Sequence, residues 1–244
     1  MPNEQTITFC CDSYHLVGTL HVPDRRPAPM VIGCHGLLAN RHSPKQIALA
    51  RTCCDNGIGY LRFDFCGCGD SPGDFTQGIA LDVRCTNLTS AIAALSDHPE
   101  CGPLLGLFGS SFGGTVVLAH SAVNPISCQV TYAAPITSRG LGTTRVSAQL
   151  DPDLRSALEQ NWHFDIGPGL AAIGNILVIH AQGDAIVPVS HAHEIHGRAR
   201  DPKKLWIQNQ GDHPMSDPGH QARFLSQAMD WYQRGLEGFP DNED

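Results

Sequence analysis

Gly109-Ser110-Ser111-Phe112-Gly113-Gly114 is the part of this 244-residue chain that most directly indicates its fold. It fits the pattern G-x-S-x-G, and Ser111 is the central serine. The apolar run at 104–108 is typical of a short buried strand, and the run at 115–122 predicts a packed helix. Ser111 is therefore expected at a sharp strand-to-helix turn that lifts its hydroxyl above the sheet edge. Glycines fit such a turn because side chains there would collide with neighbouring backbone. Taken alone, the motif also fits a glycine-rich strand-to-helix turn that has no catalytic role.

Strand and helix patterns alternate along most of the chain. Two antiparallel strands are expected first, and a regular strand–helix rhythm follows. This rhythm predicts an α/β fold, with a mostly parallel sheet of about eight strands and helices on both faces. The length suits a single domain spanning 1–244. The predicted strands are 6–10, 16–22, 30–34, 59–65, 104–108, 128–133, 176–181 and 204–207, and the main predicted helices are 44–56, 79–95, 115–122 and 221–234.

One long connection interrupts this rhythm. Residues 135–172 separate two predicted strands by more residues than a single crossover helix needs, and long connections are usually lids or binding loops. A helix is expected at 150–158, and a small cap insertion over about 137–172. Trp162 and Phe164 are candidate substrate-binding residues in this cap. The alternative is an ordinary helix with a surface loop, whose aromatic side chains pack on one another.

Polar residues follow the predicted strands where a ligand would bind. Asp184 follows the strand at 176–181, and His213 follows the strand at 204–207. Because ligands bind at the carboxyl ends of parallel strands, both are expected at the same sheet edge as Ser111. A neutral histidine activates a serine hydroxyl, and a carboxylate fixes the histidine tautomer. We assign His213 as base and Asp184 as acid. Asp212 is the rival acid, but loop neighbours seldom orient each other in this way.

Two further segments carry a family resemblance. His35-Gly36-Leu37 resembles the oxyanion loop of the α/β-hydrolases, and residues 62–71 resemble their R-x-D-x-R-G-x-G-x-S segment. Cys66 stands where arginine is common in that segment, and Cys68 where histidine is common. The resemblance extends from the opening strand pair to the last helix. It implies the α/β-hydrolase fold and a triad of Ser111, His213 and Asp184.

The resemblance also implies an oxyanion hole. Backbone N–H groups stabilise the negative charge that develops on the substrate oxygen. Phe112 and Leu37 are expected to supply them, and Leu38 remains an alternative to Leu37. His35 is a candidate substrate-binding residue, and a structural role in holding the oxyanion loop is its alternative.

The chain resembles small carboxylesterases of this fold, including the cinnamoyl or feruloyl type. This resemblance implies a serine hydrolase that cleaves carboxylic esters through an acyl-enzyme intermediate. Thioesters rank second, and peptides rank third because an amide needs leaving-group protonation and usually more substrate contacts. Two further alternatives stay open. One is an acyltransferase or perhydrolase, and the other is a non-hydrolytic ligand receptor on the same fold.

The composition of the chain disfavours several classes of binding partner. A net charge of −8 disfavours nucleic acid and anionic membranes. No apolar stretch approaches the roughly 20 residues of a membrane helix. Residues 1–8 are polar and lack the regions of a signal peptide, so a cytoplasmic location is expected. The expected partner is a small-molecule ester, and the expected state is a monomer or homodimer.

Cysteine and histidine patterns give no metal prediction. The ten cysteines form no repeated C-x-x-C pattern at zinc-site spacing, so reduced structural thiols are expected. The cluster His191-x-His193-x-x-His196 is not H-E-x-x-H and lies on an expected surface helix. Neither a metal nor an organic cofactor is therefore predicted.

Overall fold

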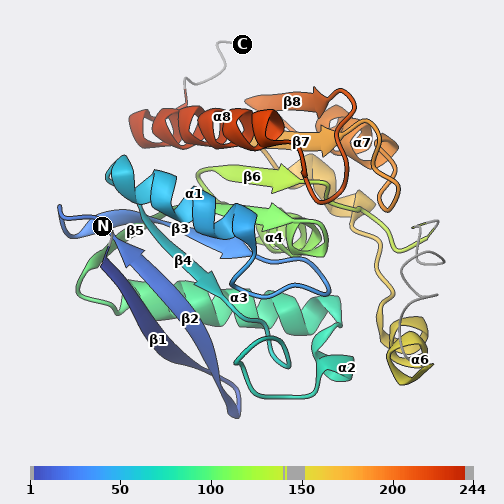
Figure 1. The fold of residues 1–244 in the computed structure, drawn as a ribbon, viewed down its shortest axis with the longest axis horizontal. Helices are drawn as coiled ribbons and strands as arrows, with labels where there is room; N and C mark the ends of the chain where they lie inside the picture. The colour runs from blue at the N-terminus through green and yellow to red at the C-terminus, as the bar shows by residue number, and fades with distance from the viewer. Residues whose placement is uncertain (1–2, 140, 142–151, 240–244) are drawn as a thin grey trace.

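The protein folds around one eight-stranded sheet (Figure 1). The computed structural model describes residues 3–139, 141 and 152–239. The strands are β1 (Asn3–Cys11), β2 (Tyr14–Val22), β3 (Ala28–Cys34), β4 (Gly59–Phe63), β5 (Cys101–Ser110), β6 (Gln129–Tyr132), β7 (Ile176–Ala181) and β8 (Lys203–Gln208). The helices are α1 (Pro44–Asp55), α2 (Phe75–Gly78), α3 (Leu81–Ser96), α4 (Phe112–Val123), α6 (Pro152–Asn161), α7 (Ser190–Arg198) and α8 (Pro218–Glu237), with a 3₁₀ turn η1 (Gly167–Ala172).

The strand order places the loops that follow β3 and β5 together. The strand order is β1-β2-β4-β3-β5-β6-β7-β8. β2 pairs antiparallel with β1 and with β4, and all later neighbours in this order, including β4 with β3, pair parallel. The chain leaves β3 toward β4 and then returns to β5 on the other side of β3. Cys34 near the end of β3 pairs with Gly109 near the end of β5. Such a switch in strand order opens a crevice at the carboxyl ends of the strands.

Helices cover both faces of the sheet and bury two apolar layers. On one face, α1 and α8 pack through residues such as Leu49 and Phe224 against Val31 and Phe108. On the other face, α3 and α4 pack through Leu88 and Val116, and α7 continues this layer beside β7. Figure 1 shows α1 and α8 together on one side of the strands, and α3 on the other. This arrangement confirms the predicted mostly parallel sheet with helices on both faces.

Element boundaries differ from the prediction where side chains bind loops. β4 ends at Phe63, two residues before the predicted limit, because Asp64 and Phe65 hydrogen-bond to the loop after β3. α8 begins at Pro218, before the predicted 221, because the Asp217 carboxylate caps it by accepting the His220 N–H at 2.8 Å. None of the helices within the described ranges combines the length and the apolar character that crossing a bilayer requires.

The long connection between β6 and β7 contains α6. The predicted helix at 150–158 is present from Pro152, and its first two residues lie outside the described residues. In Figure 1, α6 stands apart from the sheet and its covering helices. It contacts α2, and the Asn161 side chain donates to the Thr76 carbonyl at 3.0 Å. The division into one domain with a cap over 137–172 stays a prediction.

Candidate active site

Ser111 occupies a strained turn between β5 and α4. Its backbone has φ 54° and ψ −127°, a conformation that side-chain-bearing residues rarely adopt. The turn is tight: a Cβ on Gly113 would lie 2.2 Å from the Cys34 carbonyl oxygen, and one on Gly109 would lie 2.4 Å from the Gly113 carbonyl oxygen. These approaches explain why glycine flanks the serine. The turn leaves the Ser111 hydroxyl at the crevice beside β3.

The structure brings His213 and Asp184 to this serine from two other loops. His213 Nε2 lies 3.1 Å from Ser111 Oγ, and His213 Nδ1 lies 2.7 Å from Asp184 Oδ2. Asp184 follows β7 and His213 follows β8, so residues far apart in sequence meet at one sheet edge. Because both distances are within hydrogen-bond range, the three side chains form a continuous chain in which proton transfer from serine to histidine is feasible.

Asp184 is a buried, fully engaged carboxylate. Its second oxygen, Oδ1, accepts the N–H groups of Ile186 and Val187, both at 2.8 Å. Burial by itself raises the pKa of Asp184. The hydrogen bond and charge interaction with His213, together with the two backbone donors, outweigh burial and lower the pKa below its usual value. Asp184 is therefore ionised at neutral pH and is aimed at the imidazole.

Asp212, the rival acid, is engaged elsewhere. Its Oδ1 accepts the Ser216 N–H at 2.8 Å, and its backbone carbonyl accepts the Tyr132 hydroxyl at 2.5 Å. Neither contact involves His213. Among the described residues, the Asp212 carboxylate shapes the turn after β8, whereas Asp184 faces the imidazole.

The loop after β3 lies against the serine. A Cβ on Gly36 would lie 3.3 Å from Ser111 Cβ, so this backbone nearly touches the candidate nucleophile. Within the described part of the chain, the N–H groups of Leu37 and Phe112 have no acceptor among the loop and cap hydrogen bonds. Leu37 and Phe112 therefore stay the candidate donors to a substrate oxygen.

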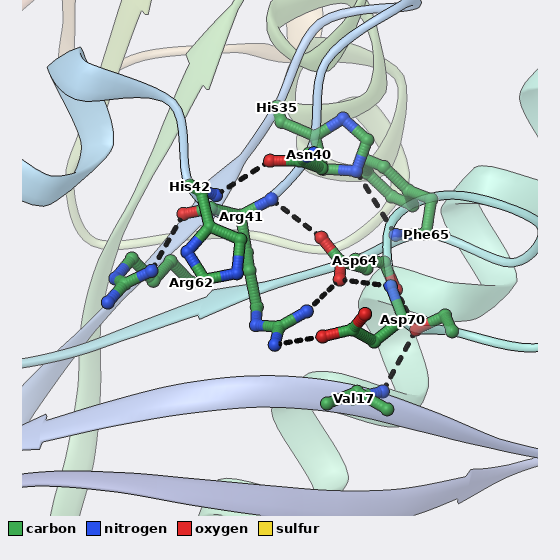
Figure 2. Close-up of polar contacts among 10 residues, drawn as sticks. Val17, His35, Asn40, Arg41, His42, Arg62, Asp64, Phe65 and Asp70 are labelled. Atoms are coloured by element: carbon green, nitrogen blue, oxygen red, sulfur yellow. Dashed lines mark hydrogen bonds and ion pairs between the residues drawn. The ribbon is translucent and has the colours of Figure 1, made fainter.

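A buried ion-pair network anchors the far end of this loop (Figure 2). Asp64, just after β4, accepts the Arg41 N–H at 2.6 Å through Oδ1 and pairs with the Arg41 guanidinium through Oδ2. Arg41 also reaches Asp70 at 2.5 Å. His35 anchors the near end, because its Nε2 accepts the Phe65 N–H at 3.2 Å. The loop is therefore fixed at both ends to the segment that follows β4.

A mostly apolar cavity of about 270 Å³ opens over the serine and histidine. α6 and the segment after it supply Leu158 and Trp162, and the loop after β7 supplies Ile186 and Val187. Trp162 therefore lines the cavity, and its contact with substrate stays a prediction. The whole lining is Gly36, Leu37, Leu38, Ala39, Ser43, Lys45, Ser110, Ser111, Pro135, Leu141, Leu158, Trp162, Ile186, Val187, His213 and Pro214.

Two candidate substrate-binding residues do not reach this cavity. His35 is fully buried, and its ring binds backbone on both sides, so the suggestion that it contacts substrate is corrected to its structural alternative. Phe164 is buried behind the lining and packs on Phe112 and Trp162, with ring centroids 5.2 Å and 5.5 Å away. Its position supports the cavity wall instead of forming it.

The sequence analysis did not identify two cationic side chains near the site. Lys45, at the start of α1, lines the cavity and donates to the Pro214 carbonyl at 2.8 Å. Arg84, on α3, is fully buried against the loop after β3. The only signal for Arg84 was a single charge on the buried stripe of a predicted helix, and Lys45 had none.

The described residues contain no cluster of three or more histidine, cysteine or carboxylate side chains that could hold a metal ion. His191, from the histidine cluster of α7, turns inward, where its Nδ1 accepts the Ile136 N–H at 3.1 Å. The ten cysteines all lie within the described residues and are unpaired, and most are buried in the two apolar layers.

Solved structures with this architecture are hydrolases and esterases. Dienelactone hydrolase from Anabaena variabilis is 19% identical with a TM-score of 0.73, covering 96% of this chain and 98% of that one. Est1E from Butyrivibrio proteoclasticus, solved with ferulic acid bound, is 17% identical with a TM-score of 0.75, covering 95% and 99%. The chain therefore has the α/β-hydrolase fold, as the sequence resemblance implied.

The sequence comparisons find only distant relatives. No protein-family model matches the chain. The uncharacterized protein YfhR of Salmonella typhimurium is 26% identical over 241 residues, 92% of this chain and 80% of that protein. The chain spans about half, 54%, of YfhR from Escherichia coli O157:H7, at 24% identity over 65% of this chain. The mitochondrial palmitoyl-protein thioesterase ABHD10 of Mus musculus is 22% identical over 214 residues, 78% of this chain and 70% of that protein.

Proposed function

We propose that the protein is a serine hydrolase that cleaves carboxylic esters through an acyl-enzyme intermediate. The observation that carries this proposal is the hydrogen-bonded chain Ser111–His213–Asp184 at the floor of an apolar cavity. Serine alone is a weak nucleophile at neutral pH, and an oriented imidazole supplies the base that activates it.

In the first half-reaction, Ser111 Oγ attacks the ester carbonyl carbon as its proton moves to His213 Nε2. The carbonyl electrons move onto oxygen, and the N–H groups of Phe112 and of Leu37 or Leu38 donate to that oxyanion. Collapse of the intermediate breaks the bond to the alcohol oxygen, which takes the proton from His213. The alcohol departs, and the acyl group remains on Ser111.

In the second half-reaction, a water molecule gives its proton to His213 Nε2 and attacks the acyl carbon. The second oxyanion occupies the same position. Its collapse breaks the bond between the acyl carbon and Ser111 Oγ, which takes the proton from His213 Nε2 as the carboxylic acid is released. Asp184 stays ionised throughout, because its role is to hold the imidazole tautomer and stabilise the imidazolium. The sum of the steps is one ester and one water converted into one acid and one alcohol.

Labelling with a fluorophosphonate probe, followed by peptide mapping, tests this proposal. The wild type is expected to be labelled at Ser111, and Ser111→Ala is expected to lose both labelling and ester turnover while keeping its fold by circular dichroism. Ser110→Ala is the matched control, since Ser110 ends β5 on the other side of the turn. Turnover that survives in Ser111→Ala would overturn the assignment.

A thioester is the second candidate substrate class. The apolar lining and the similarity to a protein named palmitoyl-protein thioesterase favour it. Oxygen and sulfur leaving groups differ while the acyl group stays the same, so the comparison needs matched pairs. Values of kcat/KM for ethyl octanoate and S-ethyl thiooctanoate, which differ only in the oxygen or sulfur atom of the leaving group, separate the two classes. A higher kcat/KM for the thioester would move it to first place.

A further inference from the structure

Arg84 is a buried guanidinium that faces the candidate oxyanion loop. It lies on α3 with none of its surface exposed. Its Nη2 donates to the Leu37 carbonyl at 3.2 Å, Nη1 lies 3.5 Å from the Gly36 carbonyl, and Nε donates to the Gly78 carbonyl at 3.2 Å. The guanidinium also stacks over the rings of Phe65 and Phe112, 4.7 Å and 5.1 Å from their centroids.

This charge has no anionic partner among the described residues. Every acceptor recorded for it is a carbonyl, the Cys68 sulfur or an aromatic face. Burial lowers the pKa of Arg84 to about 10, which still leaves the side chain cationic at neutral pH. Burying a charge without a counter-ion destabilises the folded state, so a functional role for Arg84 would explain why the fold keeps it.

The geometry of the loop supplies that explanation. A peptide group is planar and trans, so its N–H points away from its carbonyl. Donors that hold the Gly36 and Leu37 carbonyls therefore direct the N–H groups of Leu37 and Leu38 to the opposite side. His35 acts in the same sense. Its Nε2 accepts the Phe65 N–H, so the proton lies on Nδ1, which donates to the Gly36 carbonyl at 2.8 Å.

We infer that Arg84 is a positioning residue for the oxyanion hole. Its guanidinium fixes the orientation of the Gly36–Leu37 and Leu37–Leu38 peptides and places a positive charge behind them. It also packs on the ring of Phe112, the residue that supplies the other expected donor. The counter-ion for Arg84 is thus the oxyanion itself, which exists only in the transition state and the tetrahedral intermediates. This inference rests on the proposed serine hydrolase function.

The inference has a specific kinetic consequence. An interaction that is realised only when the substrate oxygen becomes negative lowers the barrier and leaves ground-state binding unchanged. Loss of Arg84 should therefore reduce kcat far more than it changes KM. Removing one oxyanion donor outright costs about 10²–10³-fold in kcat, and a residue that acts through such a donor should cost less, on the order of 10- to 100-fold.

The test compares Arg84→Met and Arg84→Lys with wild type. Arg84→Met keeps much of the side-chain volume and loses the charge, whereas Arg84→Lys keeps the charge and loses the planar fork. We expect kcat to fall in the order wild type, Arg84→Lys, Arg84→Met, with KM nearly constant. Affinity for a boronic acid, which becomes a tetrahedral anion on Ser111, should fall in parallel with kcat.

Arg62→Met is the matched control. Arg62 is also a buried arginine, but it donates to His21, Glu4 and the Arg41 carbonyl at the far end of the loop, away from the Gly36–Leu37 and Leu37–Leu38 peptides. It should lower thermal stability and weaken boronic acid binding far less than Arg84→Met does. If Arg84→Met does not fold, Arg84→Lys decides the question: a parallel fall in kcat and in boronic acid affinity supports the inference, and unchanged values of both contradict it.

The inference is overturned if the Arg84 variants fold and retain both kcat and boronic acid affinity, or if Arg62→Met weakens both equally. Failure of the proposed function looks different, because the wild type itself would then show no fluorophosphonate label at Ser111.

Discussion

Asp184 and Asp212 show how the surroundings of a residue decide its role. Both follow a strand at the same sheet edge, and both are carboxylates near His213. Asp184 is buried and holds the imidazole at 2.7 Å, whereas Asp212 binds the Ser216 N–H. We expect Asp184→Asn to lower kcat by about 10²–10⁴-fold, because the amide favours the wrong histidine tautomer. Steady-state kinetics on an activated ester measures this change.

Asp212→Asn is the matched control, and its kcat should stay within about threefold of wild type, as for other substitutions away from buried networks. The reverse ranking of the two variants would reassign the acid.

The pH profile is a second property decided at the residue scale. His213 must be neutral to accept the serine proton, so kcat/KM should fall as acid protonates it. The pKa of Asp184 lies below its usual value, so that carboxylate stays ionised across the acid limb. We therefore expect an acid limb of slope one in the logarithm of kcat/KM against pH. A limb of slope two, or a flat profile between pH 5 and 8, would contradict this pairing.

At the scale of elements, the approach of α4 to β3 limits what the turn tolerates. A Cβ on Gly113 would lie 2.2 Å and 2.5 Å from the backbone oxygens of Cys34 and His35. Backbone atoms at that distance cannot give way cheaply, so Gly113→Ala should destabilise the fold by about 2–3 kcal/mol, within the usual range for overpacking. It should also displace the loop that carries Leu37. Urea unfolding and ester turnover measure the two effects.

Gly197→Ala on α7 is the control for this prediction, because a Cβ there meets nothing within 4 Å. Alanine is the better helix former by about 0.5–1 kcal/mol, so this variant should be slightly stabilised. Equal changes in the free energy of unfolding of the two variants would contradict the prediction, because the close approach of Gly113 to β3 would then have no effect on stability.

At the scale of the whole molecule, the cavity joins the sheet to the segment that contains α6. Trp162 lines this cavity and Phe164 packs behind it, although the two lie only two residues apart. Trp162→Ala should enlarge the cavity and shift the preferred acyl group toward longer or bulkier chains. Phe164→Ala should lower the melting temperature and leave the acyl preference unchanged. A series of para-nitrophenyl esters with increasing acyl length tests the contrast, and identical shifts in both variants would contradict it.

Local patterns predicted the elements well because each depends on neighbouring residues. The strand at 176–181 was predicted with its observed limits, and the G-x-S-x-G run placed Ser111 at the observed turn. Limits were missed where distant residues intervene: β4 ends at Phe63, and the next side chain, Asp64, binds Arg41 in the loop after β3.

The fold class, the strand–helix rhythm and the candidate triad could be predicted from the sequence, because short motifs and apolar periodicity are properties of adjacent residues. Which candidates reach the cavity depends on the three-dimensional arrangement, in which His35 and Phe164 lie outside the lining and Lys45 lies within it. The position of Arg84 behind the Leu37 turn also becomes visible only there. Burial, hydrogen-bond direction and charge pairing depend on contacts between residues that lie far apart along the chain, so local patterns do not contain them.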